Sequence, residues 1–373
     1  MKPEIIAYYL PQFHRTKEND EWWGTGFTEW TNVAKAQPLF KGHYQPKIPT
    51  ELGFYDLRYP DVREAQAKMA KEAGISAFCY WHYWFGSGKK LLNYPFEEVV
   101  RLGEPDFPFC LAWANHSWYK KSWQARSGHT AVPDGSKLLM EQTYPGISDI
   151  DAHFYDLLDA FRDSRYYKID GKLVFVIFAP QDMPDWNTFK QRWNELAIAN
   201  GLPGFFFVGH VYRVQFLQNV KSMEFDAINL STHQQAFPFK NDVSNLFSKI
   251  AIKLRGMYAI KPNIIEYEKA IELMKFDLFS QEDIIPTIIP NWDHTPRSGR
   301  YGTCFHNCTP DLFGKHLDYM FNVIKDKQEN RQILFLKSWN EWGEGNYMEP
   351  DIKYGDGLIK MLKQKISQHF PKE

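Results

Sequence analysis

The chain has 373 residues, of which 44% are hydrophobic and 24% are charged. Its 44 lysines and arginines nearly balance its 45 aspartates and glutamates, giving a formal net charge of −1. The hydrophobic content excludes intrinsic disorder, and the even charge argues against a nucleic-acid binder or a polybasic membrane anchor. A chain of this length suits either two domains or one (β/α)8 barrel with insertions.

The N-terminal segment enters an apolar run at Ile5 with no small-residue cleavage site after it, which predicts a first strand rather than a signal peptide. No apolar stretch approaches the ~20 residues that a membrane span needs. The four cysteines, without a secretion signal, do not indicate a disulfide framework. We therefore expect a cytoplasmic protein with no membrane span.

Short apolar runs alternate along the chain with longer amphipathic stretches. The runs are continuous, as in parallel strands that are buried on both faces. We expect strands at 5–9, 77–81, 107–113, 173–178, 205–209, 227–230, 284–289 and 333–336. Helical periodicity predicts helices at 61–73, 151–163, 186–200, 264–276, 310–326 and 357–368.

This alternation favours an α/β fold, a single (β/α)8 TIM barrel, with residues 1–373 as one catalytic barrel domain. An open, doubly wound sheet is the alternative, but the sequence has no Gly-rich nucleotide loop to go with it. The segments that fit neither pattern each follow an apolar run. We expect them to be long βα loops on the C-terminal face, where barrel active sites are built: 11–60, 115–145, 233–262 and 291–310.

Polar and aromatic side chains gather where the expected strands end. Aromatic rings stack on the C–H faces of sugars, and imidazoles and amides pair with hydroxyls, so this mixture indicates a carbohydrate site. For most of the phenylalanines we accept the alternative that aromatic residues fill the core. The strand-end residues that we expect to approach one cavity are Trp81, His82, Trp113, Asn115, His116, His233 and Trp292.

Two carboxylates, Glu341 and Glu344, follow the last expected strand. Gly343 and Gly345 indicate that the chain turns here, so both side chains could face the barrel mouth. Glycoside cleavage uses two carboxyl groups, ~5–5.5 Å apart for retention or ~6.5–9.5 Å apart for inversion. We interpret the two glutamates as such a pair, with exposed loop glutamates as the alternative. Glu349, beside a proline, is expected to support the loop.

Three further features bear on ligands. Glu29 is a candidate ligand contact, although capping a turn is an equal alternative. Cys304 and Cys308 could suggest zinc, but a second ligand pair at standard spacing is missing. Asp293 would join a site only through tertiary proximity. We predict no metal and no organic cofactor.

Several motifs resemble the hallmark sequences of the WbsX-like family. They are WWGTGFTEWTNV at 22–33, PLFKGHYQP at 38–46, WANHSW at 113–118 and NWDHTPR at 291–297. Proteins of this family occur in bacterial polysaccharide and O-antigen clusters and are often labelled glycosyltransferases. The resemblance spans nearly the whole chain.

A more distant resemblance is to glycoside hydrolase family 99, the endo-acting α-mannosidases on a (β/α)8 barrel. It rests on WNEWGEG at 339–345 and on Glu349 with the proline after it. This resemblance implies retention through a 1,2-anhydrosugar. It further implies that Glu341 deprotonates the substrate 2-hydroxyl, and that Glu344 is the acid for the leaving oxygen and later the base for water.

The same resemblance implies aromatic substrate contacts. Tyr8 and Tyr9 are similar to the aromatic pair that ends the first strand in family 99, so we expect one of them to contact the reacting sugar ring. Trp342 lies between the two glutamates in sequence. Together with Glu29 and Asp293 it completes the expected substrate-binding set.

The leading hypothesis is an enzyme that cleaves or remodels an α-glycosidic bond of a bacterial polysaccharide or oligosaccharide. A glycosyltransferase of lipopolysaccharide or O-antigen biosynthesis is the alternative enzyme class, although the sequence has no Gly-rich turn for a nucleotide. A non-catalytic glycan-binding barrel is the third hypothesis, and the presence of both glutamates counts against it. The expected partner is a carbohydrate and no nucleic acid.

Overall fold

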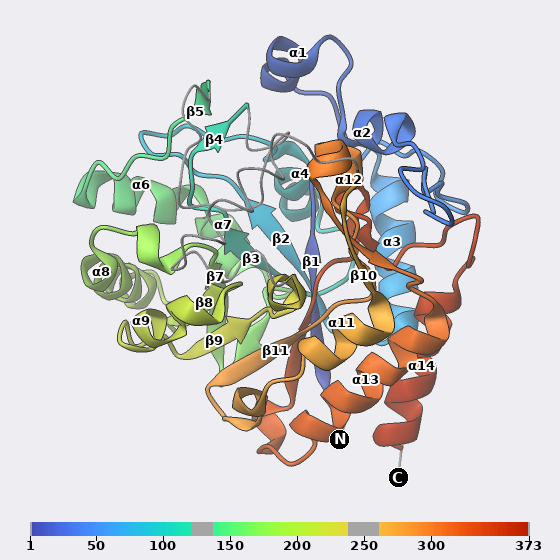
Figure 1. Ribbon diagram of the computed structural model, residues 1–373. Helices are drawn as coiled ribbons and strands as arrows, with labels where there is room; N and C mark the ends of the chain where they lie inside the picture. Colours follow the sequence, from blue (N-terminus) through green and yellow to red (C-terminus); the bar gives the residue numbers. More distant parts are fainter. Residues whose placement is uncertain (1, 121–136, 238–260, 372–373) are drawn as a thin grey trace, which may run out of the picture.

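Eight parallel strands close into a barrel in the computed structural model, which describes residues 2–120, 137–237 and 261–371 (Figure 1). The hydrogen-bonded order is β1-β2-β3-β7-β8-β9-β11-β13, and β13 pairs back with β1. The predicted (β/α)8 barrel is confirmed. Its strands are β1 (Glu4–Tyr9), β2 (Ala77–His82), β3 (Phe109–Trp113), β7 (Lys172–Ile177), β8 (Phe205–Val211), β9 (Ala227–Leu230), β11 (Ile284–Ile288) and β13 (Ile333–Leu336).

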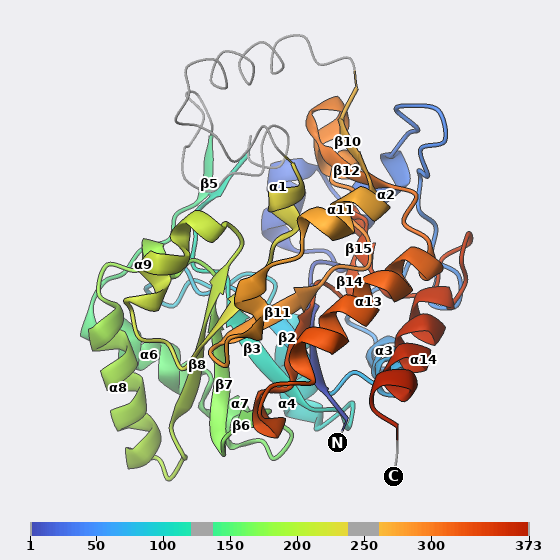
Figure 2. The same cartoon turned by 60° about the horizontal axis from the view of Figure 1, so that its bottom comes forward.

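Helices surround the barrel and connect its strands (Figure 2). Their ends follow local sequence signals: Pro60 occupies the first turn of α3, and Gly74 ends that helix in the left-handed conformation with a φ of 97°. The outer helices are α3 (Pro60–Ala73), α4 (Tyr94–Leu102), α6 (Ile147–Asp156), α7 (Leu158–Arg162), α8 (Trp186–Ala199), α9 (Leu217–Lys221), α11 (Tyr267–Leu273), α13 (Pro310–Ile324) and α14 (Gly357–His369).

Two of the predicted helices differ from the structure. The first residues of the predicted helix 264–276 belong to β10 (Asn263–Glu266), which pairs in parallel with β12 (Thr303–His306). Adjacent β-branched isoleucines in this stretch favour a strand. The predicted helix 151–163 is divided between α6 and α7 at Leu157. The sequence pattern predicts neither α4 nor α9, which are short.

The loops at the carboxyl ends of the strands carry several small elements of their own. In Figure 1, α1, α2 and α12 lie at the end of the barrel opposite the two termini. The predicted βα loops at 115–145 and 233–262 fall partly outside the described residues. The elements of this face are α1 (Lys17–Trp23), α2 (Glu29–Lys35), β4 (Trp118–Tyr119), β5 (Leu138–Met140), α12 (Thr295–Ser298), β14 (Asn340–Glu341) and β15 (Asn346–Tyr347).

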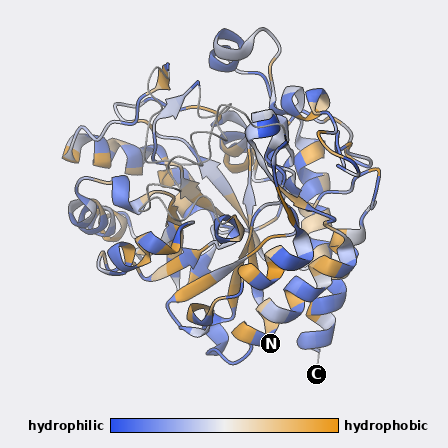
Figure 3. Cartoon of the chain, viewed as in Figure 1, coloured by the Kyte–Doolittle hydropathy of each residue, from blue (hydrophilic) through white to orange (hydrophobic). Residues whose placement is uncertain are grey.

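The hydrophobic core includes the barrel strands and the inner faces of the helices. Strands β2, β3 and β9 are buried along their whole length, which explains their continuous apolar sequences. Hydrophilic residues dominate the outward sides of α8 and α14 in Figure 3. Among the described helices, none is long and apolar enough to cross a membrane.

Candidate active site

The two glutamates lie in a tight turn that follows β13. The antiparallel pair β14 and β15 encloses a short 3-10 helix, Trp342–Glu344, and Gly345 closes the turn in the left-handed region with a φ of 54°. The Ser338 hydroxyl holds this turn, since it donates to the Asn346 carbonyl and accepts from the backbone N–H of Glu341. The chain therefore turns where the glycines predicted.

Both carboxylates meet the guanidinium of Arg297, in α12. Its Nη1 donates to Glu344 Oε1 at 2.6 Å and to Glu341 Oε1 at 3.3 Å. Because the two oxygens share one nitrogen, their separation cannot exceed the sum of these two distances. This close approach of one oxygen from each carboxylate is compatible with the ~5–5.5 Å spacing of the carboxyl groups in retaining glycosidases.

Arg297 is held from its other side by Glu29, in the first turn of α2. Its Nε donates to Glu29 Oε1 at 2.9 Å, and the Glu29 side chain is fully buried. A Cβ atom on Gly343 would overlap this carboxylate and stand 2.6 Å from Glu29 Cδ. Glycine is therefore required at position 343, because Glu29 occupies the space of a side chain.

Two more basic side chains reach the carboxylates. Lys337 Nζ lies 3.5 Å from Glu344 Oε2 and 3.7 Å from Glu341 Oε2, and it stands over the Trp292 ring at 5.4 Å. His294 Nε2 lies 3.6 Å from Glu344 Oε1. Neither Arg297 nor Lys337 is among the site residues that the sequence predicts. Lys337 directly follows a strand, so the rule that selected the other strand-end residues would have found it.

These charges shift the pKa values of the two glutamates in opposite directions. Burial would raise the pKa of Glu344, but Lys337, Arg297 and His294 outweigh it and hold that pKa well below its ordinary value. Burial, reinforced by the negative charge of Glu344, raises the pKa of Glu341. Glu344 is therefore the more readily ionised of the two glutamates, and Glu341 binds a proton more readily.

Tyr8 and Trp81 point into the barrel interior. The Tyr8 hydroxyl crosses to Asn229 Oδ1 on β9 at 2.8 Å, and its ring stacks on Trp81 at 4.8 Å between centroids. Phe178 packs against Trp81 and against His116, with ring centroids 5.3 and 5.2 Å apart. Trp81 and His116 therefore belong to one aromatic group, joined by Phe178, at the carboxyl ends of β2 and β3.

Tyr9 points the other way. Its hydroxyl donates to Gln66 Oε1 of α3 at 2.6 Å, and its ring packs on Tyr80. Successive residues of a strand face opposite sides, so Tyr9 must lie in the helix layer when Tyr8 lies in the barrel. Of the two expected tyrosines, Tyr8 alone remains a candidate for the sugar site.

His82 and Trp113 also lie between the barrel and its helices. His82 Nε2 is 2.8 Å from Nε2 of His153 in α6, and burial lowers the pKa of His82 to about 3. Trp113 stacks on Phe189 of α8 at 5.5 Å between centroids. We correct the expectation for these two residues: their position at a strand end is as predicted, but the strand's alternation turns them away from the interior.

Asn115 and Trp342, two of the residues expected to contact the substrate, bond to neighbouring parts of the protein. Asn115 exchanges two hydrogen bonds with the backbone of Ala179, which ties the loops after β3 and β7 together. Trp342 is fully buried, donates from Nε1 to Glu349 Oε2 at 2.6 Å and stacks on Tyr347 at 3.8 Å. Trp342 thus packs under the turn that carries the glutamates.

His233 and Trp292 lie on the other side of the carboxylates. Their rings are 4.4 Å apart between centroids, and Trp292 Nε1 donates to Thr303 Oγ1 at 2.9 Å. Lys337 connects this pair of rings to the glutamates through its contact with the Trp292 ring. The structure therefore brings His233 and Trp292 to the carboxylate pair.

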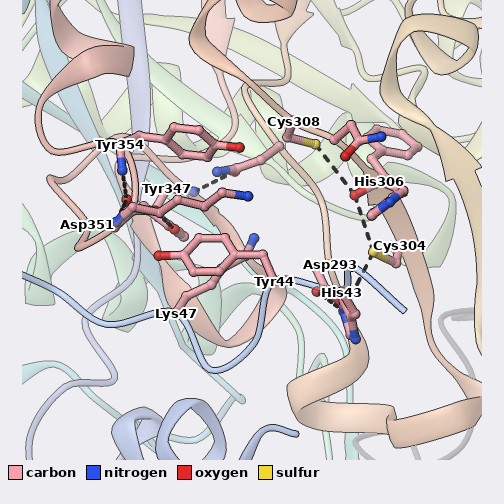
Figure 4. Close-up of a pocket in the computed structure, with 15 residues that line it drawn as sticks. His43, Tyr44, Lys47, Asp293, Cys304, His306, Cys308, Tyr347, Asp351 and Tyr354 are labelled. Atoms are coloured by element: carbon pink, nitrogen blue, oxygen red, sulfur yellow. Dashed lines mark hydrogen bonds and ion pairs between the residues drawn. The ribbon is translucent and has the colours of Figure 1, made fainter. Parts of the chain in front are cut away.

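Asp293 ties three loops together. Its Oδ2 accepts from His43 Nε2 at 2.8 Å and from Gln45 Nε2 at 2.7 Å, and its backbone N–H donates to the Glu344 carbonyl at 2.6 Å. It borders a cavity of about 30 Å³, shown in Figure 4, that has room for a water molecule or two and not for a sugar ring. Asp293 therefore positions the loop that carries Glu344.

His43, Asp293 and Cys304 form a cluster whose potential ligand atoms lie within 4.8 Å of one another (Figure 4). His43 Nδ1 accepts from the Leu39 backbone N–H at 3.0 Å, so the neutral ring carries its proton on Nε2, which faces Asp293. A metal ion would need that nitrogen without its proton. His43, Asp293 and Cys304 therefore fit a hydrogen-bonded contact between loops better than a metal site.

The fold and the glutamate pair together define a class of protein. It is a (β/α)8 barrel with two neighbouring carboxylates, Glu341 and Glu344, at the carboxyl ends of its strands. The chain belongs to the family described as Glycosyltransferase WbsX, whose family model matches residues 5–362. It is 30% identical over 370 residues to the "Uncharacterized protein WxcX" of two strains of Xanthomonas campestris pv. campestris. The match covers 98% of this chain and 50% of each relative, so the chain spans about half their length.

Solved structures share the barrel. Two structures of a GH99 endo-alpha-mannosidase from Bacteroides thetaiotaomicron align with TM-scores of 0.53 and 0.55 at 16% and 15% identity, and both cover at least 97% of each chain. A structure described as "Glycoside hydrolase-like protein" aligns with a TM-score of 0.56 at 17% identity, over 98% of this chain and 94% of the other. At these identities the likeness shows the fold alone.

Proposed function

We propose that this protein is a carbohydrate-active enzyme that cleaves an α-glycosidic bond of a bacterial oligosaccharide or polysaccharide, or transfers the released sugar. The observation that carries the proposal is the carboxylate pair Glu341 and Glu344, buried at the mouth of the barrel and joined through Arg297. The name of the fold relatives, endo-alpha-mannosidase, supports an α-linked substrate. The whole of residues 1–373 would act as one catalytic domain.

The spacing and environment of the pair support a retaining reaction without a metal. One carboxyl group must give a proton to the leaving oxygen while the other acts as a base or nucleophile, and both must then reverse roles toward water. Opposed pKa shifts prepare two like groups for these two tasks. Glu341 and Glu344 show such opposed shifts.

We propose that the sugar platform consists of Trp81, His116, His233 and Trp292, together with the glutamate pair. Trp292 and His233 border the carboxylates through Lys337, and Trp81 and His116 meet in the barrel interior. Aromatic faces in such positions bind pyranose rings by stacking. Glu29 acts through Arg297 and need not touch the sugar.

Transfer from a nucleotide sugar is the second candidate, and it rests on the description of the family. Arg297 and Lys337 are cations that a diphosphate would attract. Both, however, lie against the glutamates in this structure. A transferase would leave that carboxylate pair without a role in binding phosphate.

The products of the reaction separate these functions. We would incubate the purified protein with α-linked oligosaccharides and, separately, with nucleotide sugars and acceptor glycans, using the double variant E341Q/E344Q as control. The proposal expects new reducing ends or transglycosylation products that the double variant does not form. Release of nucleoside diphosphate by both proteins would contradict it, and glycan binding without any product would indicate a binding barrel.

A further inference from the structure

The cavity in Figure 4 adjoins the turn that carries the glutamate pair. Most of its lining comes from three segments of the chain, within 42–47, 304–308 and 351–354. Lys47 forms part of its wall, is only 7% exposed, and donates from Nζ to the Gly345 carbonyl at 3.1 Å. Gly345 directly follows Glu344, so a ligand in this cavity would lie close to the proposed catalytic turn.

The two carboxylates of the lining already have their hydrogen bonds within the protein. Asp293 accepts four hydrogen bonds through its two carboxylate oxygens, and Asp351 accepts three. The donors are His43, Gln45 and Thr295 for Asp293, and Tyr347, Lys353 and Tyr354 for Asp351. A carboxylate has about four lone-pair sites. Asp293 and Asp351 therefore leave little capacity to accept a hydrogen bond from a ligand.

The two lysines of the lining, by contrast, keep donors to spare. Among the described residues, neither Lys47 nor Lys353 forms an ion pair with a carboxylate. Lys353 Nζ stands over the rings of Tyr44 and Tyr354, at 4.8 and 4.9 Å from their centroids. An ammonium group has three N–H donors, and a buried charge is costly without a partner. The cavity therefore offers donors and positive charge to a group that only accepts.

The size of the cavity and its aromatic border narrow the choice of ligand. Its volume of about 30 Å³ has room for a water molecule or two, and hence for the oxygens of a carboxylate, which is an acceptor-only group. The partly buried rings of Tyr44 and Tyr354 meet edge to face beside it, with centroids 6.2 Å apart. Such rings pack against the C–H groups of sugars. A uronic acid matches both features, with its carboxylate in the cavity and its ring outside over the tyrosines.

We propose that this cavity binds the carboxylate of a uronic acid residue in the glycan, with Lys47 and Lys353 as its charged partners. The inference rests on the proposed function and names its substrate class, an acidic glycan. Lys47 would then hold the substrate and the Gly345 carbonyl at once, which places the uronic acid beside the turn of the glutamate pair.

The binding of simple sugars to the whole protein tests this site without turnover. We would measure Kd by ligand-observed NMR, at fixed ionic strength, for methyl α-glucuronide, methyl α-galacturonide, the neutral methyl α-glucoside and acetate. The wild type should bind at least one uronide about tenfold more tightly than the glucoside, which is the usual effect of a hydrogen bond to a charged group. It should also bind that uronide more tightly than acetate, because acetate has no ring to meet the tyrosines.

Variants of the two lysines assign the binding to the cavity. K47M and K353M should each lose the preference for the uronide over the glucoside. K275M is the matched control, because Lys275 also stands over a tyrosine ring, at 5.5 Å from the centroid of Tyr319, and does not line the cavity. It should bind as the wild type does. If K47M fails to fold, K353M carries the comparison, since Lys353 is exposed.

Three results would overturn the inference: equal affinity for uronides and glucoside, acetate binding as tight as uronide binding, or a uronide preference that K353M retains in full. Failure of the proposed function has a different signature. It would appear in the product assay as an absence of released sugar, whereas release from neutral glycans without uronide binding would refute this inference alone.

Discussion

Arg297 is the residue on which the candidate site depends. Three sequence motifs far apart in the chain meet at its guanidinium: Glu29 from the N-terminal excursion, Arg297 itself, and the two glutamates of the last motif. A buried ion pair is costly to break, since the remaining charge loses both water and partner. The geometry of the pair is therefore fixed by charge as much as by the turn that carries it.

The first prediction concerns Gly343. G343A should destabilise the protein by roughly 2–5 kcal/mol, because its methyl group would displace the buried Glu29 carboxylate from Arg297. Thermal or urea unfolding measures the loss. In an E29S background, the same substitution should cost much less, because serine leaves the space that the methyl group needs. An equal cost in both backgrounds would show that Glu29 is not the obstacle.

The second prediction concerns metal content. His43 uses both ring nitrogens in hydrogen bonds, to Leu39 and to Asp293. The purified protein should therefore carry no stoichiometric zinc, and dialysis against EDTA should leave its unfolding temperature unchanged. Elemental analysis provides the measurement. Zinc at one equivalent that disappears in C304S would contradict the prediction.

Residues of the candidate site could be predicted where their chemistry and their spacing were both visible in the sequence. The glutamates were recognised because two glycines and several aromatic residues surround them in sequence. The partners of Glu341 could not be inferred in the same way, because Arg297 and Glu29 approach it only through tertiary structure. From the sequence, Glu29 is equally compatible with a ligand contact and a turn cap, and in the structure its carboxylate pairs with Arg297.

At the scale of elements, the positions of the strands could be predicted from the sequence. Which side chains of each strand point into the barrel could not. A strand buried on both sides shows an unbroken apolar run, so all eight were placed within two residues of their ends. The same property hides which side chains face inward. His82 and Trp113 were therefore placed at the correct end of the barrel and on the wrong side of its wall.

The third prediction uses two tryptophans that end neighbouring strands. Trp113 packs between the barrel and α8, so W113A should destabilise the protein by about 3–5 kcal/mol, as large core truncations do. Trp81 stacks in the barrel interior. W81F keeps most of that packing and should weaken catalysis or glycan binding, whereas W113F should leave both nearly unchanged. Unfolding and kinetic measurements on W81F and W113F compare these effects. Equal losses of activity in the two variants would contradict the placement of Trp81 inside the barrel and Trp113 outside it.

At the scale of the whole molecule, a buried acid links the last loop to the outer helices. Glu349 accepts from Trp342 Nε1, Tyr55 and Gln66, at 2.6, 2.9 and 2.6 Å. Gln66 lies on α3 and also accepts from Tyr9 of the barrel, so one network joins the barrel, the helix and the turn that carries Glu341 and Glu344. The loop-support role expected for Glu349 agrees with these bonds.

The fourth prediction is a pH dependence of stability. Burial raises the pKa of Glu349 from 4.5 to about 7 despite its hydrogen bonds. The folded protein thus holds this proton more tightly than the unfolded chain does. The resulting stabilisation is complete below pH 4.5 and is lost as the pH rises through about 7. Its size is of the order of 3 kcal/mol at ~1.4 kcal/mol per pKa unit.

The variant E349Q keeps the shape of the side chain and removes its titration. Unfolding curves at pH 5 and pH 8 should show the wild type losing more stability than E349Q over this range. Parallel losses in the two proteins would show that Glu349 does not titrate there.

The central claim is that Glu341 and Glu344 break a glycosidic bond, and turnover by the single variants tests it most directly. The measurement is kcat/KM of the wild type, E341Q and E344Q on one α-linked glycan that the wild type cleaves. Because general acid–base catalysis contributes ~10²–10⁴ in rate, each variant should lose at least a hundredfold. If neither loses more than about tenfold, which is only ~1.4 kcal/mol of barrier, the pair is not the catalytic machinery.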